Sequence, residues 1–196
     1  MSQPTAAHRT SVWATWRFYG WVVVLAAWLC MFVSSIAILN LTFFISPFQQ
    51  AFGWSLGSIV FVQSISSWIG APYGLIVGRV VERWGPRRAV LIGAVLGGIS
   101  VAAIGLINQL WQFYLLFGIV APFGFTLIYN IAPVSTVRRW FMRRAGLSAS
   151  LVWTGSGLGM VAGGPLIVWM ISSFGWRWTF PALGLILLIG AGVGAM

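Results

Sequence analysis

The chain has 196 residues, of which 60% are hydrophobic and only 6% are charged. A soluble domain is about one quarter charged, so this composition excludes a water-soluble globule and predicts the lipid bilayer as the surrounding medium. The formal net charge of +10 does not indicate nucleic-acid binding, because the arginines lie in short clusters between long uncharged runs rather than on one folded basic surface.

Long uncharged runs predict an all-α membrane protein. Each run approaches or exceeds the ~20 apolar residues that a helix needs to cross the hydrocarbon layer, and none alternates as the strands of a membrane barrel do. The first run is longer than the core of a signal peptide, so we interpret it as a retained span. Six transmembrane helices are predicted over residues 19–196, at about 21–45, 55–78, 89–108, 111–137, 146–172 and 178–196.

The distribution of arginine predicts the orientation of these spans. Ten of the eleven basic residues, all arginines, precede the first span or follow the second and fourth, and only Arg177 falls on the other side. Because cytoplasmic loops carry the excess of positive charge, we expect both ends of the chain in the cytoplasm, with residues 1–18 as a cytoplasmic tail.

The loop after the second span, GRVVERWGPRR, contains Glu82, the only acidic residue of the chain. One interpretation is a surface pair with Arg79 on a continuing helix, which is worth ~0–1 kcal/mol. The pattern G-x-x-x-[D/E]-R-x-G-x-R-R, however, resembles the signature loop of the major facilitator superfamily. The residues that match are Gly78, Glu82, Arg83, Gly85, Arg87 and Arg88. The resemblance implies a cytoplasmic gate whose acid bonds to a helix end in a second half and favours the outward-facing state.

A second stretch, RRWFMRRAGLSASLVWTGSG at 138–157, resembles the start of span five in monocarboxylate transporters and oxalate–formate antiporters. The matching positions include Phe141, Arg143, Arg144 and Gly155. This resemblance implies the N-terminal half of a twelve-helix fold with 3+3 inverted repeats. It also implies secondary active transport of a small organic anion, a monocarboxylate or dicarboxylate, by alternating access.

The start of the first span distinguishes two branches of these relatives. Many eukaryotic monocarboxylate carriers have an acidic residue there, whereas this chain has Tyr19, Gly20 and Trp21. The sequence therefore favours the bacterial-like branch, with antiport and a location in the bacterial cytoplasmic (inner) membrane as what that branch implies.

Glycines recur every fourth residue in two spans. Gly70, Gly74 and Gly78 lie in the second, and Gly155, Gly159 and Gly163 lie in the fifth. Such series indicate faces on which another helix packs closely. In the resembled fold both spans border the second bundle, so both series are expected to face a partner that the chain lacks. That partner is either the C-terminal six-helix half or a second half-transporter chain. The alternatives are a channel-like module that works as an oligomer and a truncated, nonfunctional membrane fragment.

Polar residues of spans one and four are candidates for a substrate cavity, because these spans line the cavity of the resembled fold. They are Ser35, Asn40, Thr42 and Ser46 in span one and Thr126, Tyr129 and Asn130 in span four, of which Asn40 and Asn130 are the best candidates. Hydrogen bonding between helices is an equal alternative for such residues. No span contains Asp, Glu, His, Lys or Arg, the groups that relay protons or hold anions inside a membrane. No metal cluster, phosphate-binding loop or nucleophile–base pair is found either, so we expect no cofactor and no enzyme activity.

Overall fold

All regular structure in the described part of the chain is helical. The computed structural model describes residues 6–131 and 145–195, and within them the side chains of residues 21–129 and 146–192. The elements are α1 (Ala6–Ile38), η1 (Leu41–Phe44), α2 (Ile45–Phe52), α3 (Leu56–Trp84), α4 (Pro86–Ile104), α5 (Leu110–Phe113), η2 (Tyr114–Val120), α6 (Ala121–Phe125), η3 (Thr126–Ile131), α8 (Ala145–Phe174) and α9 (Trp176–Ala195). The predicted all-α class is confirmed.

Five segments are long and apolar enough to cross a membrane. They are Trp21–Phe52, Leu56–Trp84, Pro86–Ile104, Leu110–Tyr129 and Gly146–Phe174. The α9 helix contributes a shorter apolar stretch, Trp176–Gly192. The described residues therefore support five spans by length and composition, and the sixth span and the orientation stay predictions.

Glycine and proline set the turn between the second and third spans. The α3 helix starts at Leu56 after Ser55, whose Oγ accepts a hydrogen bond from the Ser58 backbone N–H at 3.2 Å. It continues past the predicted end at residue 78, because the first residue that leaves helical geometry is Gly85, with φ +81°. A positive φ suits glycine, and the Pro86 that follows starts α4 without needing a helical N–H donor.

The first span is broken rather than continuous. The α1 helix ends at Ile38, and a single 3₁₀ turn leads into α2. At the break, the Asn40 side chain is buried, and its Nδ2 donates to the carbonyl of Ile36 at 3.1 Å. The amide thus satisfies a carbonyl that the end of the helix leaves without its usual partner.

The fourth span departs from regular α-helix in two places. The η2 and η3 segments have π-helical geometry, and they flank α6, which contains Pro122 near its start. Proline has no N–H to donate to the preceding turn, and π-helical turns are often found at functional sites. Thr126 and Tyr129, two of the cavity candidates, lie in the second of these segments.

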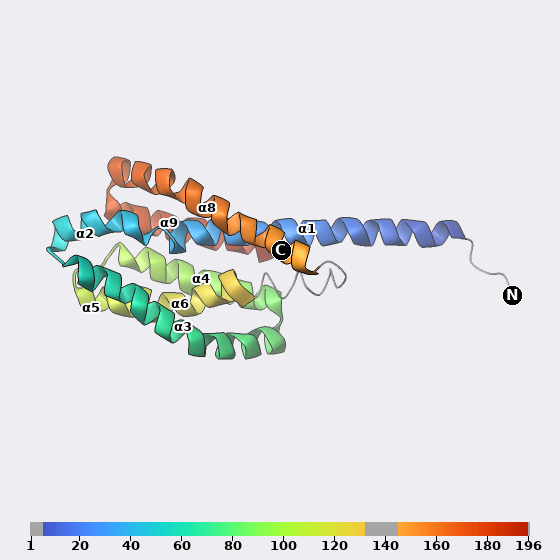
Figure 1. Cartoon of the computed structure of the whole chain (residues 1–196), viewed down its shortest axis with the longest axis horizontal. Helices are drawn as coiled ribbons and strands as arrows, with labels where there is room; N and C mark the ends of the chain where they lie inside the picture. The colour runs from blue at the N-terminus through green and yellow to red at the C-terminus, as the bar shows by residue number, and fades with distance from the viewer. Residues whose placement is uncertain (1–5, 132–144, 196) are drawn as a thin grey trace.

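Figure 1 shows α3 and α8 at opposite edges of the bundle, with α1, α4, α6 and α9 between them. The α8 helix packs against α1 and α9, whereas α3 packs against the fourth span and α4. Only 11% of the most apolar window of α3 is buried, compared with 56% for the fourth span. The α3 helix is therefore the most exposed of the five candidate spans.

Aromatic rings join α2, α5 and α9 at the end of the bundle opposite Glu82. The ring of Phe48 is fully buried. It lies 5.2 Å from Trp176, 5.3 Å from Phe113 and 5.8 Å from Phe180, measured between ring centroids. Edge-to-face and stacked rings at these separations stabilise a core beyond the area that they bury. This cluster fixes the ends of three spans relative to one another.

Candidate functional site

The loop that carries Glu82 is a tight connection between α3 and α4. Glu82 and Arg83 lie in the last turn of α3, and both side chains are exposed. Within residues 21–129 and 146–192, whose side chains the structure describes, Glu82 forms no ion pair with Arg79 or Arg83. The surface pair with Arg79, one of the two interpretations of the acid, is therefore not formed here. Arg87 and Arg88 follow in the first turn of α4 and are also exposed.

The glycine series of α3 faces open space. A Cβ atom added to Gly70, Gly74 or Gly78 would meet nothing within 4 Å. Gln63 and Ser67 are exposed, and their spacing of four and seven residues places them on the same side of the helix as Gly70 and Gly74. This side of α3 therefore presents small and polar groups, with the exposed side chains of Leu56 and Val60 near its start, and no part of the described chain covers it.

The glycine series of α8 is packed against α1. A Cβ added to Gly155 would lie 2.6 Å from the carbonyl oxygen of Trp28, and one added to Gly163 would lie 2.5 Å from Nδ2 of Asn40. At Gly159, such an atom would collide with the backbone of Phe32. The expectation that this series faces a partner outside the chain is therefore wrong, because the absence of side chains lets α1 approach α8 closely.

The predicted cavity residues are not brought together as one group. Asn40 is buried at the break of the first span, where its Nδ2 contacts the carbonyls of Ile36 and Ser35. Thr42 is exposed in η1. The Thr126 Oγ1 donates to the carbonyl of Pro122 at 2.7 Å, within its own helix. The Asn130 side chain and the motif residues Phe141, Arg143 and Arg144 lie outside the described side chains.

Tyr129 is a cavity candidate whose side chain forms a hydrogen bond to another span. Its hydroxyl is hydrogen-bonded to Ser156 Oγ of α8, and its ring lies edge-on to Trp153 at 5.5 Å. Close by on α8, Thr154 Oγ1 accepts a hydrogen bond from Trp28 Nε1 of α1 at 3.2 Å. Two polar contacts therefore link α8 to the first and fourth spans, in addition to the packing of its glycines.

Trp28 lies inside the first predicted span, where packing in the core or against lipid is the simplest interpretation from the sequence, so sequence reasoning missed its hydrogen bond. The available signal is the indole N–H, because a tryptophan inside a span needs an acceptor for this donor. Thr154 offers one on the neighbouring helix. The donor and the acceptor are far apart in sequence, so no local pattern pairs them.

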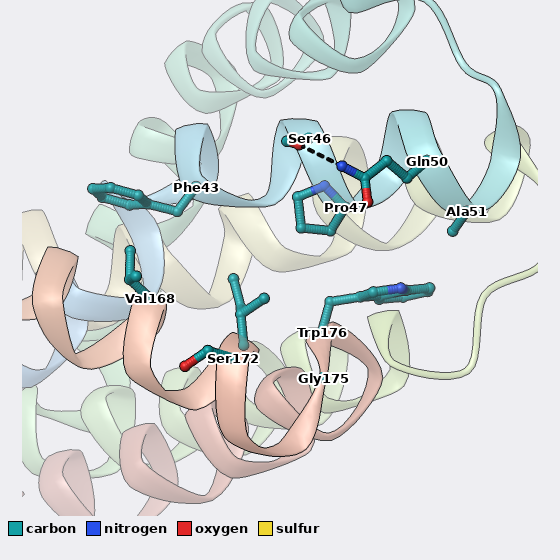
Figure 2. Close-up of a pocket in the computed structure, with 10 residues that line it drawn as sticks. Phe43, Ser46, Pro47, Gln50, Ala51, Val168, Ser172, Gly175 and Trp176 are labelled. Atoms are coloured by element: carbon teal, nitrogen blue, oxygen red, sulfur yellow. Dashed lines mark hydrogen bonds between the residues drawn. The ribbon is translucent and has the colours of Figure 1, made fainter.

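A cavity of about 610 Å³ lies between α2 and the turn that joins α8 to α9. Figure 2 shows Phe43, Ser46 and Gln50 on one side and Val168, Ser172 and Trp176 on the other. Gln50 donates to Ser46 Oγ at 3.1 Å, so two of its polar groups bond to each other. The full lining is Phe43, Ser46, Pro47, Gln50, Ala51, Val168, Ile171, Ser172, Gly175 and Trp176. Of the described polar residues predicted for a cavity, only Ser46 is part of this lining.

The loop motif, the broken first span and the apolar helices point to one family, and the sequence profile of the Major Facilitator Superfamily matches residues 27–196. The chain belongs to the Major Facilitator Superfamily. The superfamily consists of membrane transporters rather than enzymes, so the chain is a multi-pass integral membrane protein of a transporter family. This confirms the family that the motif at Gly78–Arg88 predicted.

Similar proteins include the fujikurins efflux protein of Gibberella fujikuroi, 28% identical over 86% of this chain and 36% of that protein. Monocarboxylate transporter 11 of Homo sapiens is 27% identical over 88% of this chain and 35% of its own length. Monocarboxylate transporter 2 of Mesocricetus auratus is 29% identical over 87% of this chain and 35% of its own length. The chain thus spans little more than a third of the length of these relatives.

The relatives agree with the predicted branch of the superfamily more than with the predicted location. Two of the three are monocarboxylate transporters, in line with the resemblance of residues 138–157 but not with the bacterial-like branch that the start of the first span favoured. All three come from eukaryotes. The preference for a bacterial inner membrane therefore gains no support from them, and membership of a multi-pass membrane family is what the comparison establishes.

Proposed function

We propose that this superfamily member forms the N-terminal bundle of a secondary active transporter that moves a small organic anion by alternating access. Relatives named as monocarboxylate transporters support the substrate class. The share of their length that the chain spans supports the assignment to one bundle rather than to a whole carrier. A second six-helix unit would then complete the transport path.

The observation that carries this proposal is the open side of α3. Gly70, Gly74 and Gly78 have nothing within 4 Å of a Cβ position, and the polar side chains of Gln63 and Ser67 are exposed beside them. Lipid tails neither fill a glycine groove nor satisfy an amide, whereas another helix does both. A helix of the second bundle is therefore the proposed occupant of this side.

Glu82 would act where the two bundles meet. It continues the glycine series by one more step of four residues, so it lies at the end of the same side of α3. A carboxylate there can accept hydrogen bonds from the N-terminus of a facing helix, which carries partial positive charge. Making and breaking these bonds as the bundles tilt would couple the acid to the conformation of the carrier.

The binding of an organic anion would need groups from both bundles. The candidate spans contain no lysine or arginine among the described residues 21–78, 89–129 and 146–174. The charge that pairs with a carboxylate substrate would therefore come from the second bundle. The bundle formed by the present chain would supply neutral hydrogen-bonding groups. Tyr129 and Ser156 are the best placed of these, because they lie together between two spans.

Flux measurements in liposomes test the proposal. We expect the chain alone to give no uptake of lactate, oxalate or formate above empty liposomes, and the protein that includes a second six-helix bundle to transport at least one of them. Robust uptake by the chain alone would contradict the requirement for a second bundle. Cross-linking of the same vesicles would then show whether a dimer of half-transporters is responsible.

If the complete protein moves none of the three anions, while a panel of neutral solutes shows flux, the anion class is wrong but the bundle assignment stands. The role of Glu82 at the gate is tested in the complete protein with the Glu82→Gln variant, which preserves the shape of the side chain and removes its charge.

A further inference from the structure

The exposed surface of α3 is divided into two chemically different strips. The first is the glycine side described above, which ends at Glu82. The second contains Phe61, Trp68 and Ile76, whose side chains are 55%, 83% and 45% exposed. Spacings of seven and eight residues stack these apolar side chains on one side of the helix. Bulky apolar groups with this exposure suit lipid tails rather than a closely packed helix.

The apolar strip ends in two arginines. Arg79 follows Ile76 by three residues and precedes Arg83 by four, so both continue the strip that carries Trp68. Both side chains are exposed. Glu82 lies between this strip and the glycine side, three residues after Arg79 and next to Arg83.

The length of α3 places these arginines at the membrane surface. From Leu56 to Arg79 the helix rises about 35 Å at 1.5 Å per residue. This distance slightly exceeds the ~30 Å of the hydrocarbon layer. The guanidinium groups therefore reach the level of lipid headgroups, and the exposed ring of Trp84 is suited to the same layer.

The charge at this end of the hairpin is unbalanced. Four arginines, Arg79, Arg83, Arg87 and Arg88, accompany a single carboxylate between residues 78 and 88, which leaves an excess of three positive charges. Arg83 at the C-terminal turn of α3 is favourable for the helix dipole, whereas Arg87 and Arg88 at the start of α4 are not. An anion from outside the chain would offset this excess.

We propose that Arg79 and Arg83 form a binding site for the phosphate of an anionic phospholipid, on the side of α3 that faces away from the glycine series. The acyl chains of the lipid lie along Phe61, Trp68 and Ile76, and its phosphate accepts hydrogen bonds from the two guanidinium groups. Arginine suits this role because its planar donors match phosphate oxygens in pairs. The proposal does not require transport, since the apolar strip faces away from the glycine series, but its Arg83 also belongs to the loop motif.

Native mass spectrometry of the purified chain in detergent tests the site, with phosphatidylglycerol and phosphatidylcholine of matched acyl chains as probes. We expect phosphatidylglycerol to bind preferentially. Replacing both residues in an Arg79→Gln/Arg83→Gln variant should weaken its binding roughly 30-fold, about fivefold for each arginine. An Arg79→Lys/Arg83→Lys variant keeps the charge and should stay within about fivefold of the original chain.

Two controls decide between a local site and general attraction. Arg177→Gln removes one charge at the other end of the bundle and should leave phosphatidylglycerol binding unchanged. Glu82→Gln removes a negative charge close to Arg79 and should not weaken this binding. Circular dichroism and a monodisperse elution profile confirm that each variant is folded. The Lys variant carries the test alone if the Gln variant does not fold, because loss of preference for phosphatidylglycerol in a folded Lys variant would then contradict a site based on charge.

The proposal is overturned if the folded Gln variant binds phosphatidylglycerol as tightly as the original chain, or if Arg177→Gln weakens binding by the same factor. Displacement of the lipid by inorganic phosphate at equal concentration would also overturn it, because it would indicate a site for a soluble anion. Failure of phosphate to compete supports a site that needs the acyl chains as well.

Discussion

The α3 and α8 helices carry glycine series with the same spacing but have opposite surroundings. Along α8, a Cβ at Gly155 or Gly163 would collide with α1. Along α3, a Cβ at Gly70 or Gly74 would touch nothing within 4 Å. One series is thus used inside the bundle, and the other is left at its edge, where Figure 1 shows α3.

A series of small residues therefore indicates that some helix can pack closely against it, but it does not indicate which helix. The residues beside each series are more informative. Next to the α8 glycines lie Thr154 and Ser156, and both find hydrogen-bond partners on other spans of the chain. Next to the α3 glycines lie Gln63 and Ser67, which are exposed. Hydrogen bonds to other spans accompany the internal contact, whereas beside the open series the Ser67 hydroxyl donates only to the Gln63 carbonyl of its own helix.

The largest effect is expected at Gly159 of α8. In a Gly159→Ala variant, the new methyl group would collide with the backbone of Phe32, which cannot move aside as a flexible side chain can. We expect the free energy of unfolding to fall by about 3 kcal/mol, at the upper end of the range for overpacking. Unfolding by SDS in micelles, followed by tryptophan fluorescence, measures the change. Gly157→Ala is the matched control, because a Cβ at that position meets nothing within 4 Å. Equal stability of the two variants would contradict the tight contact between α1 and α8.

A smaller effect is expected at Glu82, and only where a second bundle is present. In the complete protein, Glu82→Gln should remove a hydrogen bond to a charged group, worth about 1.5–3 kcal/mol, and shift the carrier toward inward-facing states. Labelling of engineered cysteines from the cytoplasmic side should rise accordingly. In the chain alone, the same variant should leave stability unchanged, since the carboxylate is exposed. Unchanged labelling in the complete protein would leave Glu82 without a role at the gate.

The hydrogen bond between Tyr129 and Ser156 tests the polar contacts of α8. We expect Tyr129→Phe to lower the free energy of unfolding by about 0.6 kcal/mol, the average for hydrogen bonds between membrane helices. A double-mutant cycle with Ser156→Ala isolates the pair, because the double variant should be little worse than either single one. Additive losses in the cycle would show that the two hydroxyl groups do not interact.

The smallest effect is expected at the open series. Gly74→Ala places a methyl group in empty space, and alanine favours the helix by up to about 1 kcal/mol over glycine. The chain alone should therefore be as stable as before or slightly more stable in the SDS titration. The same substitution in the complete protein should reduce transport, because the second bundle needs that space. A loss of stability in the chain alone would indicate that another helix of the same chain covers Gly74.

The helical class and the approximate positions of the five candidate spans followed from the uncharged runs, since only a backbone with internal hydrogen bonds can cross lipid. Their ends did not. The α3 helix runs to Trp84 because arginine and glutamate are good helix formers in water as well, and Gly85 followed by Pro86 is where the helix actually stops. Hydropathy predicts which residues lie in the membrane, whereas the glycine and proline of the turn determine where the helix ends.

The candidate site was harder to predict than the helices. The loop motif led to the correct superfamily, because its residues lie close together in sequence. Asn40 looked like a substrate group but caps the end of α1, and Trp28 looked like packing but donates to Thr154. A hydrogen-bonding group inside a membrane must find some partner, and the sequence does not say which one.

The sequence by itself determined that the chain is a membrane protein, that it is helical and that it belongs to a transporter superfamily. These properties depend on composition and on short local patterns. Only the tertiary structure decided which glycine series α1 covers and which stays open, and that the strip of α3 with Phe61 and Trp68 is left exposed. The reason is that helix period fixes which residues share a face, while the direction of that face depends on how distant helices pack.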